Sequence, residues 1–173
     1  VGDEIKGTKL DLPHRTDYQG VAGLLARDRI AEIMADPYYN SLDDSYRKAF
    51  IQQELSQSRQ IARAAIDNFG LETSIPFEDY YALAKQVQVI LQPYFDIENT
   101  VWSQYPLEVR QESDRIDKTT ANNREVKAEL VKLSSNIGTS ILEARYLIAK
   151  QRAKLKGGPQ TRLSKTLKEY ANY

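Results

Sequence analysis

The sequence predicts an all-α protein of about six helices, with a long helical hairpin or a coiled-coil-like arm towards the C-terminus. Two observations carry this prediction. Apolar residues recur three and four positions apart through most of the chain, as on one face of a helix. Prolines at positions 37, 93 and 106 divide these runs into segments of helical length. No segment shows the alternation of apolar and polar residues that is typical of a strand.

Length and composition fit a folded protein with its own core. The chain has 173 residues, of which 41% are hydrophobic and 28% are charged. It contains no cysteine, which excludes disulfides and thiolate nucleophiles. The longest apolar stretch, Val21 to Ala26, is too short to span a bilayer, and no secretory signal is recognisable at the start. We therefore expect a soluble protein with no membrane insertion.

Residues 1–15 are expected to form an extended N-terminal arm, because Gly2, Gly7 and Pro13 interrupt it and few of its residues are apolar. A helical domain is predicted to follow over residues 16–106.

The first predicted helix of this domain begins at Thr16 or Asp17 and ends before Pro37, since the residue before a proline is disfavoured in the helical conformation. Asp43 or Asp44 is expected to open a second helix that runs to Gly70.

A third helix is predicted to begin near Pro76 and to be broken by Pro93. A short fourth helix is expected to run from about Asp96 to Gln104 and to end before Pro106.

Residues 107–156 contain no proline and show a seven-residue apolar repeat that indicates a long helix or a helical hairpin. The segment Ser134 to Thr139 favours the hairpin, because serine, asparagine and Gly138 gather there. Gly157-Gly158-Pro159 indicates a linker, and residues 157–173 are expected to form that linker and a short C-terminal helix. The apolar seam of this arm is the predicted protein interface, formed by Leu130, Leu133, Ile137 and Leu147.

Charge is unevenly distributed although the net charge is zero. Residues 1–143 carry 16 basic and 23 acidic residues, whereas residues 144–173 carry 8 basic residues and 1 acidic residue. Such an imbalance points to an acidic partner or to non-specific contact with DNA phosphates, and the alternative is docking on acidic helices of the same fold. The basic residues concerned are Arg145, Lys150, Arg152, Lys154, Lys156, Arg162, Lys165 and Lys168.

No constellation of residues indicates catalysis, so the sequence predicts no enzyme, no catalytic residue, no cofactor and no metal. His14 is the only histidine, and one imidazole supplies neither a triad with an oriented base nor a histidine-based zinc site in a chain without cysteine. The acidic pair Asp43-Asp44 lies where a helix begins, which suits the helix dipole better than catalysis. Glu54 is interpreted as a surface ion-pair residue. Three of the aromatic clusters, Tyr38-Tyr39, Tyr80-Tyr81 and Tyr94-Phe95, are expected to pack at helix corners.

One segment resembles a known class of proteins. The sequence from Ala35 to Ile51 and the arginine pair Arg59 and Arg63 resemble a helical segment near the C-termini of tailed-phage internal virion (ejection) proteins and large polyvalent proteins. The similarity covers roughly residues 20–68. A weaker likeness to the stretch that often follows extends from Phe95 to Pro106.

The resemblance implies a structural or assembly protein, a phage internal virion or DNA-ejection component or a fragment of one, acting through helix–helix contacts. Its partners would be other virion proteins or copies of itself. It would lie inside the capsid, at the portal–tail junction, or otherwise in the host cytoplasm. The catalytic domains of the larger proteins have no counterpart here. The alternative is a helical adaptor that binds a partner through its heptad face.

Overall fold

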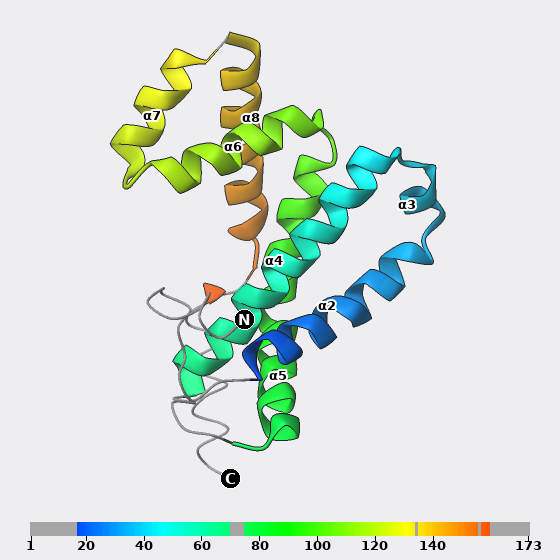
Figure 1. Cartoon of the computed structure of the whole chain (residues 1–173). Coiled ribbons are helices and arrows are strands. Elements are labelled where there is room, and N and C mark those ends of the chain that lie inside the picture. Colours follow the sequence, from blue (N-terminus) through cyan, green and yellow to red (C-terminus); the bar gives the residue numbers. More distant parts are fainter. Residues whose placement is uncertain (1–16, 70–74, 134, 156, 160–173) are drawn as a thin grey trace. The chain divides into compact units, whose positions relative to one another are not determined.

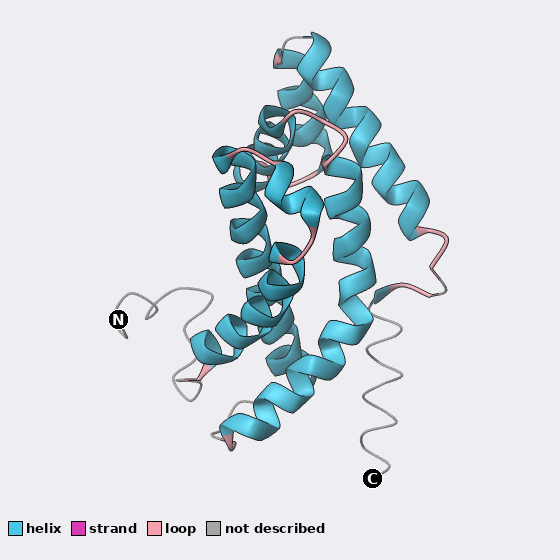
Figure 2. Ribbon diagram, turned by 90° about the vertical axis from the view of Figure 1, so that its right-hand side faces the viewer, coloured by secondary structure: helices cyan, strands magenta, loops and turns pink. Residues whose placement is uncertain are grey.

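The computed structural model describes residues 17–69, 75–133, 135–155 and 157–159. Within these residues every regular element is a helix and none is a strand, which confirms the all-α prediction (Figures 1 and 2). The described part of the chain contains seven helices, α2 to α8. The predicted N-terminal arm and the predicted last helix lie outside the described residues.

The chain divides into two compact units. The first unit comprises Val1–Gln92 and Pro159–Tyr173, and the second comprises Pro93–Gly158. The division therefore falls inside α5, at Pro93, and not at Pro106 where the sequence suggested the end of the helical domain.

In the first unit, side-chain caps mark the starts of α3 and α4, whereas Asp17 at the start of α2 makes no side-chain cap hydrogen bond. Helix α2 spans Tyr18–Met34. The segment that follows Asp36, expected to be a link, is the short helix α3, Pro37–Ser41. Asp36 caps it by accepting a hydrogen bond from the Tyr38 backbone N–H at 2.9 Å. Asp43 likewise accepts from the Tyr46 N–H at 3.1 Å, and α4 begins at the next residue, Asp44–Phe69.

The core of the first unit lies where α2 packs against α4. Leu25 and Ile61 are completely buried. Tyr80 of α5 is also completely buried, and its hydroxyl donates to the Ala62 carbonyl of α4 at 3.0 Å. Tyr18 does the same from α2, donating to the Arg59 carbonyl at 3.2 Å. The rings of these tyrosines are therefore buried between helices, and each hydroxyl donates a hydrogen bond to a backbone carbonyl of the neighbouring helix.

The prediction that Pro93 ends a helix is wrong. Helix α5 continues through this residue and spans Phe77–Trp102, so the two helices expected here are one. An internal proline removes the hydrogen bond to the carbonyl four residues earlier, which belongs to Val89. Val89 is 72% exposed, so the freed carbonyl belongs to a residue on the surface of the helix and not to one in the core.

The second unit replaces the expected long helix or hairpin with three helices that follow the end of α5. They are α6 at Leu107–Thr119, α7 at Asn123–Lys132 and α8 at Ser135–Arg152. Helix α8 packs against α6 and α7, and α6 also contacts α7 (Figure 1). The turn near Ser134 was expected, whereas the break between α6 and α7 was not.

That unexpected break is encoded by a local capping arrangement. The Asn122 side chain accepts from the Glu125 backbone N–H at 3.0 Å, and the Glu125 carboxylate accepts from the Ala121 N–H at 2.6 Å. The reciprocal bonds satisfy donors at the start of α7, as a capping box does. At the end of α6, the Thr120 hydroxyl donates to the Ile116 carbonyl at 2.6 Å.

Gly138 lies inside α8 and does not break it. A Cβ atom at this position would lie 3.0 Å from the Leu130 carbonyl oxygen of α7. The absent side chain thus permits a close approach between α7 and α8, which gives this glycine a packing role.

The predicted protein interface packs within this unit. Leu130 belongs to the buried core, and Leu133, Ile137 and Leu147 are partly buried against it. The seven-residue repeat thus selected core residues correctly, although it indicated a seam between chains. The buried members of this core are Val101, Trp102, Val109, Ile116, Leu130, Ile141, Ala144 and Ile148.

Candidate interaction surface

Two of the eight C-terminal basic residues are bound to the acidic helices of their own unit. Arg145 pairs with Asp117 at 2.9 Å and also donates to the Ser113 carbonyl at 3.2 Å. Arg152 pairs with Glu98 at 2.9 Å and donates to the Tyr94 carbonyl at 3.2 Å. These guanidinium groups join α8 to α6 and α5, so they stabilise the packing of the helices in this unit.

Lys150 and Lys154 differ from these arginines. Both are exposed, and neither has an ion pair or hydrogen bond with any residue that the structure describes. Lys156, Arg162, Lys165 and Lys168 lie outside the described residues.

The outer side of α8 also exposes large apolar residues. Leu142 is 54% exposed and Tyr146 is 65% exposed, and they lie one helical turn apart. Ala149 and Ala153 continue the same row at the next turns and are exposed as well. We call these four residues the α8 ridge. On a helical projection, Lys150 lies at one edge of the ridge, and Arg145 and Arg152 follow the other. Lys154 lies in the turn that continues from the end of α8.

The one acidic residue of α8 is already engaged. Glu143 accepts a hydrogen bond from the Tyr105 hydroxyl at 2.9 Å. Burial, together with this hydrogen bond, raises the pKa of Tyr105. The charges of α8 and the adjoining turn that remain uncommitted within the described residues are therefore the two lysines, and both border the ridge.

The first unit contains two polar clusters, and both hold helices together. The Tyr81 hydroxyl donates to Asp28 at 2.8 Å, and the Lys85 ammonium pairs with the same oxygen at 3.2 Å. The hydrogen bond from Tyr81 is the main cause that holds the pKa of Asp28 below its usual range, with Lys85 adding to the effect.

The second cluster corrects the interpretation of Glu54. This residue is not on the surface but only 2% exposed, and it lies 3.5 Å from the Arg29 guanidinium. Buried carboxylates are paired because an isolated charge in the interior is costly. Glu54 thus joins α4 to α2.

A pocket of about 370 Å³ lies on the first unit beside α2 and α4. It contains the arginine pair Arg59 and Arg63, and Arg63 pairs with Asp67 at 3.2 Å. Burial raises the pKa of Tyr18, which lines the same pocket, and the two arginines act in the opposite direction. No nucleophile is paired with a base among the residues that line this pocket.

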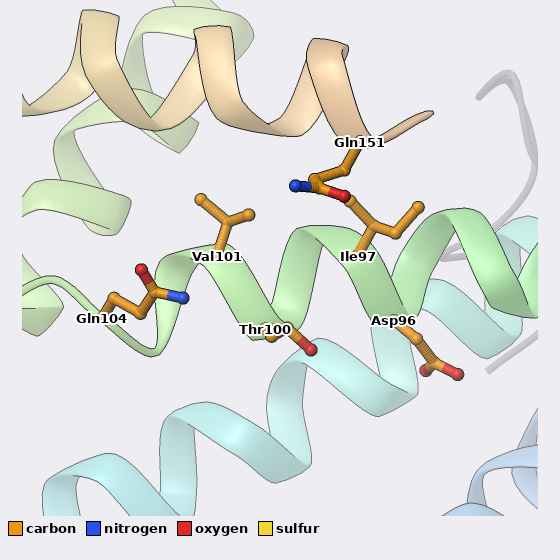
Figure 3. Close-up of a pocket in the computed structure, with 6 residues that line it drawn as sticks. All are labelled: Asp96, Ile97, Thr100, Val101, Gln104 and Gln151. Carbon is orange, nitrogen blue, oxygen red and sulfur yellow. The ribbon is translucent and has the colours of Figure 1, made fainter. Parts of the chain in front are cut away.

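The pocket of about 280 Å³ in the second unit is lined mainly by α5. Ile97 and Val101 point towards α8 and Gln151, whereas Asp96 and Thr100 extend from the other side of α5 (Figure 3). Its polar groups therefore do not converge on one point, as an active site requires.

Among the described residues, no group of three or more histidine, cysteine, aspartate or glutamate residues is placed to hold a metal ion. None of the helices in that part of the chain combines the length and the apolar character that a membrane span needs.

Comparisons with protein-family models, with curated proteins and with solved structures gave no match.

Proposed function

We propose that this protein is a structural or assembly protein that acts through helix–helix contacts. The observation that carries the proposal is the exposure of Leu142 and Tyr146 on the outer side of α8. Single exposed apolar residues are common, but two large ones on successive turns of one helix form a row that another helix can cover. The α8 ridge is rigidly placed, because Ile141, Ala144 and Ile148 on the inner side are buried in the core.

The finer proposal is a component of the interior of a tailed-phage virion, inside the capsid or at the portal–tail junction, that functions in assembly or DNA ejection. It is supported by the resemblance of residues 20–68 to phage internal virion proteins. The all-helical architecture agrees with a scaffold role. Other virion proteins or further copies of this chain would be its partners.

The assembly role is tested by replacing the two large residues of the ridge. Leu142→Ser with Tyr146→Ser should reduce self-association or binding to co-purified virion proteins, measured by sedimentation velocity on the full chain. Val131→Ser is a matched control, because Val131 is 84% exposed but lies on α7. Unchanged association in the ridge variant, with helicity retained, would contradict the proposal.

The virion location has its own test. Mass spectrometry of purified virions, before and after DNA release, should find the chain in filled particles. An ejection component should be depleted once the DNA has left, whereas a capsid component should remain. Absence of the chain from filled particles would contradict the virion proposal and leave the adaptor function in its place.

A further inference from the structure

The charged residues beside the α8 ridge indicate which kind of partner can cover it. Three of the charged residues of this region are committed to the fold: Glu143 to Tyr105, Arg145 to Asp117, and Arg152 to Glu98. Lys150 and Lys154 have no such partner among the described residues; both are positive, and they lie at the C-terminal end of the ridge.

We propose that the α8 ridge binds an acidic amphipathic helix of a partner protein. Leu142 and Tyr146 would pack against the apolar stripe of that helix, and Lys150 and Lys154 would pair with carboxylates along its edge. This inference rests on the proposed assembly function and adds the chemistry of the partner.

The dimensions of the ridge suit a helix. From Leu142 to Ala153 the row covers twelve residues and is about 16 Å long, or three helical turns. Its far half consists of Ala149 and Ala153, whose small side chains allow a second helix to approach closely. A second helix would therefore bury the most surface at Leu142 and Tyr146, and it would come closest to the backbone of α8 at the alanines.

The direction of the partner follows from the order of these features. The lysines lie near the C-terminal end of α8, and a helix N-terminus favours acidic residues. An antiparallel partner would place its acid-rich N-terminal turns beside Lys150 and Lys154.

Neither the helix dipole nor DNA binding accounts for the whole pattern. Lys150 lies in the last turn of α8 and stabilises the helix through the dipole, but this gives no reason for the exposure of Leu142 and Tyr146. Binding to DNA phosphates would explain the exposed lysines, but it would not require the apolar row of Leu142 and Tyr146.

The inference is tested with three designed helical peptides that share one apolar stripe and differ at the flanking positions, which carry Glu, Gln or Lys. Isothermal titration calorimetry on the full chain at low and moderate salt should rank the peptides Glu, Gln, Lys from tightest to weakest. Affinity for the Glu peptide should fall as salt is raised, because the pairs are exposed to solvent.

Variants of the chain locate the effect. Lys150→Gln with Lys154→Gln should weaken the Glu peptide about fivefold and leave the Gln peptide unchanged. Lys118→Gln with Lys127→Gln is the matched control, since it removes two exposed lysines of the same unit away from α8 and should change neither affinity. Leu142→Ser with Tyr146→Ser should weaken both peptides at least about tenfold.

The outcomes separate this inference from the assembly function. Loss of ranking among the peptides, with the ridge variant still defective in binding, would overturn the acidic partner and leave the assembly role intact. Tight binding of short duplex DNA that depends on the lysines and not on the ridge would also overturn it. Normal peptide binding by the ridge variant would overturn both.

Discussion

In the first unit, the hydroxyls of Tyr18 and Tyr80 donate to backbone carbonyls of α4, whereas in the second unit Arg145 and Arg152 donate to carbonyls of α6 and α5. In both units a long side chain connects one helix to the backbone of another. The tyrosines are neutral and buried, but each arginine also pairs with a carboxylate near the surface. Charge pairs occur in both units, so we infer that the contrast lies in these four side chains: the tyrosine bonds are insensitive to salt, whereas the arginine bonds carry a salt-sensitive contribution.

This difference also explains why basic residues of the same helix have different roles. The arginines of α8 lie on the side that faces other helices, where a planar guanidinium can bind a carboxylate and a carbonyl together. The two lysines lie beside the exposed ridge and have no ion pair with any residue in the described part of the chain. Inspection of charge alone would have treated all of them as one basic surface.

The largest expected effects come from the two cores. Leu25→Ala and Ile141→Ala each remove a fully buried side chain, and each should lower the free energy of unfolding by about 2–5 kcal/mol. Urea denaturation measures the loss, and hydrogen exchange locates it. We expect faster exchange in α2 and α4 for the first variant, and in α6 and α8 for the second. Equal acceleration in all helices of both variants would show that the units do not open separately.

A matched pair of substitutions tests the contrast between neutral and charged connections. Tyr80→Phe and Arg152→Gln should each lower stability by about 1 kcal/mol, because each removes a bond to a neighbouring helix. Raising the salt concentration should shrink the difference between Arg152→Gln and the wild type by screening the pair with Glu98. The cost of Tyr80→Phe should not change. Thermal unfolding at two ionic strengths measures both effects. An identical salt response of the two variants would show that the tyrosine and arginine connections do not differ in this respect.

Two glycines give a smaller effect of opposite sign in the two units. Gly23 of α2 is surrounded by open space, so Gly23→Ala should stabilise by up to about 1 kcal/mol through helix propensity. Gly138→Ala should destabilise, because its Cβ would lie 3.0 Å from the Leu130 carbonyl oxygen. Comparison of melting temperatures is sufficient. Stabilisation by Gly138→Ala would mean that α7 and α8 separate easily.

The smallest effect concerns the Asp28 carboxylate. Its pKa is lowered in the folded protein, chiefly by the Tyr81 hydroxyl, so its contribution to stability is fully present above the ordinary carboxyl pKa. That contribution is lost as the pH falls through the lowered value. Tyr81→Phe should move the pKa of Asp28 upwards, which an NMR titration of the side-chain carboxyl measures. An unchanged pKa would assign the shift to Lys85.

Local signals in the sequence predicted several helix boundaries, but they did not predict how the helices pack against one another. Asp43 and Pro37 set boundaries as expected, because caps and prolines act on neighbouring residues. Pro93 did not, because its effect depends on whether the freed carbonyl is exposed, which is a tertiary property. The apolar repeat kept its register across the break at residues 120–122, so spacing alone did not distinguish one long helix from three.

The candidate surface was harder to predict for a related reason. Helix α8 has apolar residues around most of its circumference, and Leu142 is next to the fully buried Ile141. The positions of α5, α6 and α7 decide which of these residues face the core. Glu54 was misplaced in the same way, because its burial depends on α2 lying beside it.

Hydroxyl-radical footprinting of the unmodified full chain, alone and in its assembled state, tests most directly that the outer side of α8 is the interaction surface. We predict that Leu142 and Tyr146 are oxidised in the free chain and protected after assembly. Leu130 and Tyr80 should remain unreactive in both states, as controls for the two cores. Protection of Leu130 on assembly from a reactive free state, with Tyr146 unchanged, would contradict the account and restore the heptad seam as the interface.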